Sequence, residues 1–114
     1  MISEERVEKA VEFLRDTAEQ YGQTRGHLAY CDANMRRVKS LEIMESRGTE
    51  DGSKGKSVAV MEAEAYASDA YLAAMTELQN ATAESETLRA RRDAAEMTIE
   101  VWRSQYSARK QGIT

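Results

Sequence analysis

Apolar residues recur every seven positions along the first part of the chain. One heptad series is apolar throughout and reads Val7, Leu14, Tyr21, Leu28, Met35. We expect Val11 and Ala18 to fill the alternate positions of the same helix face. Ser3 is a suitable N-cap, and Arg47 followed by Gly48 indicates a helix end, so the pattern predicts a first helix over about residues 3–47.

Two glycines interrupt the middle of this first helix. Gly22 and Gly26 each cost about 1 kcal/mol in a helix interior. A kink or break near residues 22–26 is therefore the alternative to a continuous helix, and the pattern leaves both open.

A second heptad pattern covers the other half of the chain and is rich in alanine at one position. That position reads Ala67, Ala74, Ala81, Leu88, Ala95, Trp102, and its partner position reads Tyr71, Leu78, Ser85, Arg92, Ile99, Tyr106. With Ser57 as N-cap, the pattern predicts an unbroken helix over about residues 57–110. Residues 48–56, with three glycines and no apolar side chain, are predicted to form a loop.

The charges favour folding the two helices back on each other. Residues 58–88 contain six acidic residues and no Lys or Arg, whereas the later part of the first helix is rich in basic residues. A fold-back would also bring Gly22 and Gly26 near 81–83 and Trp102 close to the N-terminal turn. We therefore predict an all-α fold, an antiparallel helical hairpin or coiled coil of two long helices, as a single domain over residues 1–114.

This architecture also predicts self-association, because a two-helix layer leaves one flank of each helix unburied. The composition agrees with long helices. The 114 residues include no proline, and nearly half are Ala, Glu, Lys, Leu or Arg. No apolar run approaches the roughly 20 residues of a bilayer span, and the start lacks a signal-peptide core. We expect a cytoplasmic homo-oligomer that has no membrane contact.

Nothing in the sequence predicts catalysis or a cofactor. Lys56 and Ser57 follow Gly55, but Glu50 stands where a phosphate-binding loop needs a glycine. The single cysteine and the single histidine of the chain lie four residues apart, which is too few groups for a metal site or a supported nucleophile. We therefore expect no catalytic residue, no metal and no enzyme activity.

Two clusters of basic residues are the candidates for a nucleic-acid-binding site. The first cluster is Arg36, Arg37, Lys39, Arg47, Lys54, Lys56. The second contains Arg89, Arg91, Arg92, Arg103, Arg109, Lys110, interleaved with Trp102 and Tyr106, and its members Arg103, Arg109, Lys110 are the candidate contacts. Basic residues beside aromatic rings can bind the phosphates and stack the bases of a single strand. The alternative is that the rings are core and the arginines pair with acids, and the alanine register of Trp102 favours that reading for this residue.

Several segments resemble a known class of phage proteins. These are Arg-Arg-Val-Lys-Ser-Leu at 36–41, an alanine-rich middle with Tyr66 and Tyr71, Leu-Arg-Ala-Arg-Arg-Asp-Ala-Ala at 88–95 and Ile-Glu-Val-Trp-Arg-Ser-Gln at 99–105. Together they resemble small helical proteins of tailed phages and prophages associated with recombination genes. The resemblance implies a recombination mediator in the host cytoplasm, an oligomer that binds single-stranded DNA and a recombinase or single-strand-binding protein.

Two other functions remain open from the residues themselves. One is a structural or adaptor coiled coil, such as a virion protein, an assembly chaperone or a partner-docking protein, that makes no nucleic-acid contact. The other is an inhibitor whose acidic stretch 58–88 imitates the charge of DNA.

Overall fold

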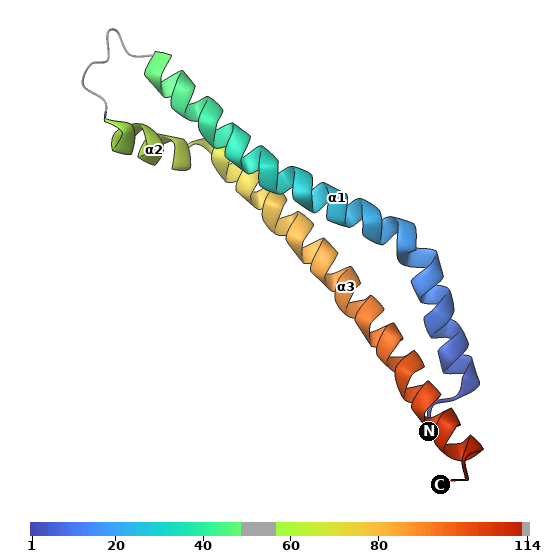
Figure 1. Ribbon diagram of the computed structural model, residues 1–114. Helices are drawn as coiled ribbons and strands as arrows, with labels where there is room; N and C mark the ends of the chain where they lie inside the picture. The colour runs from blue at the N-terminus through green and yellow to red at the C-terminus, as the bar shows by residue number, and fades with distance from the viewer. Residues whose placement is uncertain (49–56, 113–114) are drawn as a thin grey trace. The chain divides into compact units, whose positions relative to one another are not determined.

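The computed structural model describes residues 1–48 and 57–112, and this part of the chain contains three helices and no strand. The helices are α1 (Glu4–Gly48), α2 (Val58–Tyr66) and α3 (Asp69–Lys110) (Figure 1). The two long helices, α1 and α3, pack against each other. The predicted helical hairpin is therefore confirmed as the fold class.

The chain divides into two compact units. Unit 1 comprises Met1–Thr24 with the chain from Glu84 onward, and unit 2 comprises Arg25–Ala83. Each unit contains a segment of α1 packed on a segment of the second half of the chain. The prediction of a single domain stays a prediction.

Unit 1 has a narrow seam of small and polar residues. Ala10, Leu88 and Ala95 are its buried apolar residues. Thr24 and Ser85 are buried with them. The buried seam of unit 1 thus combines two alanines and a leucine with two hydroxyl side chains.

Unit 2 has a more apolar seam, which involves all three helices. Its buried residues are Cys31, Met61, Ala65, Ala74, Ala81. Cys31 is only 1% exposed, and its Sγ lies 3.5 Å from Nε2 of His27 on the same helix. The cysteine therefore packs as a small apolar residue.

The helix ends follow the predicted capping chemistry. The Ser3 Oγ accepts a hydrogen bond from the backbone N–H of Arg6 at 3.2 Å. The Ser57 Oγ accepts one from the N–H of Val60, also at 3.2 Å. Each serine satisfies a donor that the first turn of a helix leaves without a partner. At its other end α1 stops at Gly48, one residue beyond the predicted end.

The prediction of one unbroken helix over 57–110 is wrong, because the helix is interrupted at Ala67 and Ser68. The Ser68 Oγ donates to the carbonyl of Ala65 at 2.7 Å and accepts from the N–H of Tyr71 at 3.1 Å. Ser68 thus ends α2 and caps α3, because its hydroxyl gives the backbone an alternative to helical hydrogen bonds. Asp69 follows in the first turn of α3, where the helix dipole favours a negative charge.

The backbone and the burial of the first helix test what the sequence predicted for it. α1 is continuous from Glu4 to Gly48, so it is not broken at its glycines. A Cβ added at Gly22 or Gly26 would meet nothing within 4 Å, so neither glycine is needed for a close contact with another helix. Val11 is 47% exposed and Ala18 is exposed. The alternate seam positions are instead held by residues three after each member of the heptad series: Ala10, Thr17, Thr24, Cys31, Val38.

No helix among the described residues is long and apolar enough to cross a membrane.

Candidate functional site

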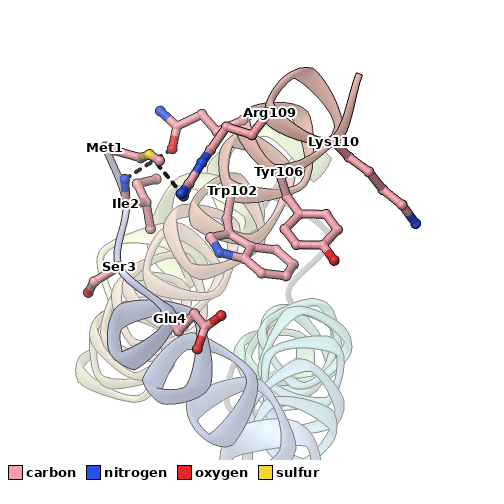
Figure 2. Close-up of a pocket in the computed structure, with 9 residues that line it drawn as sticks. Met1, Ile2, Ser3, Glu4, Trp102, Tyr106, Arg109 and Lys110 are labelled. Carbon is pink, nitrogen blue, oxygen red and sulfur yellow. Dashed lines mark hydrogen bonds between the residues drawn. The ribbon is translucent and has the colours of Figure 1, made fainter. Parts of the chain in front are cut away.

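The last turns of α3 and the first residues of the chain enclose a cleft in unit 1. Its volume is about 640 Å³. The lining residues come from both ends of the chain: Met1, Ile2, Ser3, Glu4, Trp102, Gln105, Tyr106, Arg109, Lys110. The backbone N–H of Ile2 donates to Oε1 of Gln105 at 3.0 Å, which ties the N-terminal segment to α3 (Figure 2). Trp102 therefore lies near the N-terminal turn, as the fold-back predicted.

Two stacked aromatic rings form one wall of the cleft. The centroids of Trp102 and Tyr106 are 5.2 Å apart and the ring planes differ by 22°. Their spacing of four residues on α3 brings the two side chains onto one face of the helix. Trp102 is half-buried, whereas Tyr106 is 52% exposed. The pair thus combines a ring held in the seam with a ring that presents surface to solvent.

Basic residues of the second cluster adjoin these rings. Arg109 and Lys110 line the same cleft, and they also complement the dipole at the C-terminus of α3. The guanidinium of Arg109 donates to the sulfur of Met1 at 3.6 Å, a weak acceptor. Glu4 contributes a carboxylate on the side facing the rings (Figure 2). The cleft therefore offers two cations and two rings against one anion.

Arg103, the third predicted contact of the second cluster, is not part of this cleft. Its Nη1 lies 3.1 Å from Oε1 of Glu100, and both side chains are about two-thirds exposed, at 68% and 64%. An exposed pair one helical turn apart has little stabilising effect. Arg103 thus remains a solvent-exposed cation beside an acid.

Four members of the first basic cluster, Arg36, Arg37, Lys39 and Arg47, lie on α1 in unit 2. Arg36 pairs with Asp32 at 3.0 Å, and Arg37 donates to the side-chain oxygen of Asn34 at 3.2 Å. These contacts lie within one helix and are exposed. Asp32 partly neutralises the charge of Arg36, and Asn34 orients the side chain of Arg37.

Lys39 of the same cluster makes a contact between two helices. Its Nζ lies 4.6 Å from the ring centroid of Tyr66 on α2. The side-chain hydrogen bond to Tyr66 is the largest cause of a pKa of Lys39 that lies above its usual value; partial burial lowers this pKa, and attraction to Glu62 raises it. Lys39 therefore has a packing role in unit 2.

The other members of the first cluster are Arg47, Lys54 and Lys56. Arg47 stands in the last turn of α1, where a cation complements the dipole. Lys54 and Lys56 lie outside the described residues.

Arg92, which the sequence grouped with the second basic cluster, is a structural residue of unit 1. Its Nη1 donates to the carbonyl of Leu14 at 2.8 Å and to Oγ1 of Thr17 at 2.7 Å. Its guanidinium lies over the ring of Tyr21, 5.2 Å from the centroid. The arginine therefore joins α3 to α1.

Sequence analysis missed the N-terminal lining of the cleft and the role of Gln105. Glutamine carries both a donor and an acceptor, but its partner, Ile2, is 103 residues away. The one available signal was the expected approach of Trp102 to the N-terminal turn, which located the region without naming its residues.

The described residues offer no cluster of three or more His, Cys, Asp or Glu side chains that could hold a metal ion. Comparisons with protein-family models, curated proteins and solved structures give no match to this chain.

Proposed function

We propose that the protein is a non-enzymatic accessory factor that binds single-stranded DNA as an oligomer in phage recombination or replication. The observation that carries the proposal is the stacked pair of Trp102 and Tyr106 in a cleft with Arg109 and Lys110. An exposed ring face can stack a base, and adjacent cations can contact the phosphates on either side of it. The phage and recombination context comes from the sequence resemblance alone.

The cleft favours a short single strand over a duplex. It contains one exposed ring and two cations, a footprint that fits a few nucleotides. Bases in a duplex are stacked on each other, so their faces are not available to a tyrosine ring. The acidic stretch 58–88 makes extended wrapping of DNA unfavourable, so an oligomer would gather several short contacts.

The test uses the fluorescence of Trp102, the only tryptophan of the chain. Titration with a single-stranded oligonucleotide should change this fluorescence, and binding should weaken as salt increases. Tyr106→Ala removes the exposed ring and should weaken binding about 5- to 150-fold, because stacking contributes roughly 1–3 kcal/mol per base. Tyr106→Phe keeps the ring and should restore binding.

Charge reversal then distinguishes the two basic clusters. Arg109→Glu with Lys110→Glu should abolish the salt-sensitive binding. Arg36→Glu with Arg37→Glu changes the net charge by the same amount in the first cluster and should leave most of the affinity. The absence of any salt-sensitive binding in the wild-type protein would overturn the proposal.

A second candidate function is that of an adaptor or assembly protein without nucleic-acid contact. It is favoured by exposed apolar side chains on α2, of which Val58 is 62% and Val60 46% exposed. Apolar surface of this kind is typical of protein contacts. An adaptor would show unchanged Trp102 fluorescence with any oligonucleotide, while a partner protein would contact α2.

A further inference from the structure

The short helix α2 is apolar on nearly every side. Met61 and Ala65 are buried within unit 2. Its exposed positions are Val58, Ala59, Val60, Ala63, Glu64, Tyr66. Glu64 is the one charged residue among them, and Glu62 beside them is half-buried. A helix that is apolar all round is normally covered by other protein, and this outer face of α2 is not covered within the described chain.

Unit 1 contains a groove that is also partly apolar but carries the opposite charge. The groove has a volume of about 420 Å³ and is lined by both long helices. Its floor is formed by small or apolar residues, Ala10, Phe13, Ala94, Ala95. Its rim is basic, with Arg6 and Lys9 on the α1 side and Arg91 on the α3 side. None of the described residues that line it is acidic.

We propose that the outer face of α2 docks into this groove on a second copy of the chain. The occupant is identified by charge complementarity, since the groove is rimmed with cations, whereas α2 carries two acids, Glu62 and Glu64, and no Lys or Arg. Docking removes two apolar surfaces from water, the outer face of α2 on one copy and the floor of the groove on the other. The inference rests on the oligomeric form of the proposed function and supplies its contact surfaces.

The spacing of residues on α2 fits the groove. Successive helical residues are about 100° apart, so Ala63 lies between Glu62 and Glu64, with one carboxylate on each side of it. The small side chain at the centre allows α2 to approach the alanines of the floor closely. The two carboxylates then face the two basic walls.

Both glutamates also have contacts inside their own unit. Glu64 accepts a hydrogen bond from the hydroxyl of Ser46 at 2.5 Å, and Glu62 interacts electrostatically with Lys39. A carboxylate has about four lone-pair sites, so these contacts are compatible with a cation of the second copy. On the groove side, Lys9 pairs with Glu5 at 3.2 Å, with the two side chains 72% and 76% exposed, an arrangement that is easily exchanged.

A nucleic acid is the less favoured occupant of the groove. Its floor presents alanine methyl groups and the Phe13 side chain rather than hydrogen-bond donors, and Thr98 is the one polar lining residue besides the three cations. Apolar floors with small residues suit the close packing of another helix. Binding of DNA in the groove is one outcome of the test below.

Each copy carries both a groove and an α2 face, so the contact is of the donor–acceptor type. Two such contacts close a symmetric dimer when they form reciprocally, and otherwise the contact propagates along a chain of copies. In both cases the molar mass in solution exceeds one chain.

The test measures molar mass by light scattering over a range of protein concentrations, without nucleic acid. Wild-type protein should exceed the 12.8 kDa of one chain. Ala59→Arg with Ala63→Arg places cations on the α2 face, and Arg6→Glu with Arg91→Glu reverses the groove. Each double variant alone should have the mass of one chain. Their equimolar mixture should recover association, because one variant keeps its groove and the other keeps its α2.

Matched controls separate the contact from a general effect of charge. Ala18→Arg with Ala33→Arg makes the same change at two exposed alanines of α1 and should leave association intact. A wild-type mass of one chain at every concentration would overturn the inference. So would variants that still associate, or a mixture that stays at the mass of one chain.

Cross-linking gives a second readout that does not depend on charge. Ala63→Cys and Ala94→Cys are conservative changes at exposed positions. A mixture of the two variants should form an intermolecular disulfide under mild oxidation with a copper–phenanthroline complex, and Ala33→Cys mixed with Ala94→Cys should not. Equal cross-linking in both mixtures would contradict the docking geometry.

The outcome is separable from that of the proposed function. Loss of association in the groove variant with unchanged Trp102 quenching supports docking between copies and leaves the cleft as the DNA site. Loss of DNA binding in that variant without any change in mass would instead assign the groove to nucleic acid and overturn the inference.

Discussion

Each unit contains a cation placed over a tyrosine ring between two helices, but the two cations differ in the other contacts that they make. In unit 1 the guanidinium of Arg92 lies 5.2 Å from the ring centroid of Tyr21 and also donates to Leu14 and Thr17. In unit 2 the ammonium of Lys39 lies 4.6 Å from the ring of Tyr66. A planar guanidinium can stack and donate several hydrogen bonds at once, whereas an ammonium acts as a point charge.

The difference follows from what surrounds each cation. The seam of unit 1 is polar at Thr17, Thr24 and Ser85, so it can satisfy the donors of an arginine. The seam of unit 2 is filled by Cys31, Met61 and alanines, and there the cation stays at the edge. Unit 1 therefore adds the directional hydrogen bonds of Arg92 to its packing, whereas the described buried residues of unit 2 are all apolar.

The largest effect should come from removing the Arg92 anchor. Arg92→Ala should lower the free energy of unfolding by about 1.5–3 kcal/mol, since hydrogen bonds to charged groups contribute that much. Arg92→Lys should lower the free energy of unfolding by a smaller amount, because an ammonium cannot both stack on the ring and reach two acceptors. Chemical denaturation at a fixed protein concentration measures both.

Arg15→Ala is the matched control for the arginine anchor. Arg15 is an exposed arginine of unit 1 that contacts the adjacent Asp16, and its loss should change stability by less than about 0.5 kcal/mol. Equal losses for the two alanine variants would show that Arg92 does not anchor α3 to α1.

An intermediate effect should come from the junction that positions Tyr66. Ser68→Ala removes the acceptor for the N–H of Tyr71, and loss of such a cap costs about 1 kcal/mol. The same change at Ser40, an exposed serine within α1, should cause no loss. If Ser68→Ala were neutral, the break between α2 and α3 would be set by packing rather than by the hydroxyl.

The smallest effect concerns protonation of Lys39. The hydrogen bond to Tyr66 raises the pKa of Lys39 above its usual 10.5. Because the folded-state pKa is the higher one, the stabilising contact is complete below pH 10.5 and is lost as the pH rises through the folded value. Tyr66→Phe keeps the ring but removes the phenolic oxygen, so it should lower the pKa of Lys39 in an NMR titration. An unchanged pKa would mean that the ring alone holds the ammonium.

The candidate site was only partly predictable from the sequence, because several of its side chains have partners that are far away along the chain. Arg92 and Arg109 belong to one basic run in the sequence, yet one is a structural anchor and the other lines a cleft. Their partners are far away along the chain, so local pattern could not tell them apart. The sequence predicted an open basic patch at Arg36 and Arg37, but both side chains contact residues one helical turn away.

The sequence by itself determined what depends on near neighbours along the chain. The hydroxyls of Ser3 and Ser57 mark helix starts, and the heptad alanines Ala74, Ala81 and Ala95 mark the buried face. The tertiary structure decided what depends on distant residues: the anchoring of Arg92, the cleft between Trp102 and the N-terminal segment, and the uncovered outer face of α2. The helix break at Ser68 also depends on near neighbours, but periodicity alone did not predict it, because a short-range hydroxyl contact competes there with a strong helical pattern.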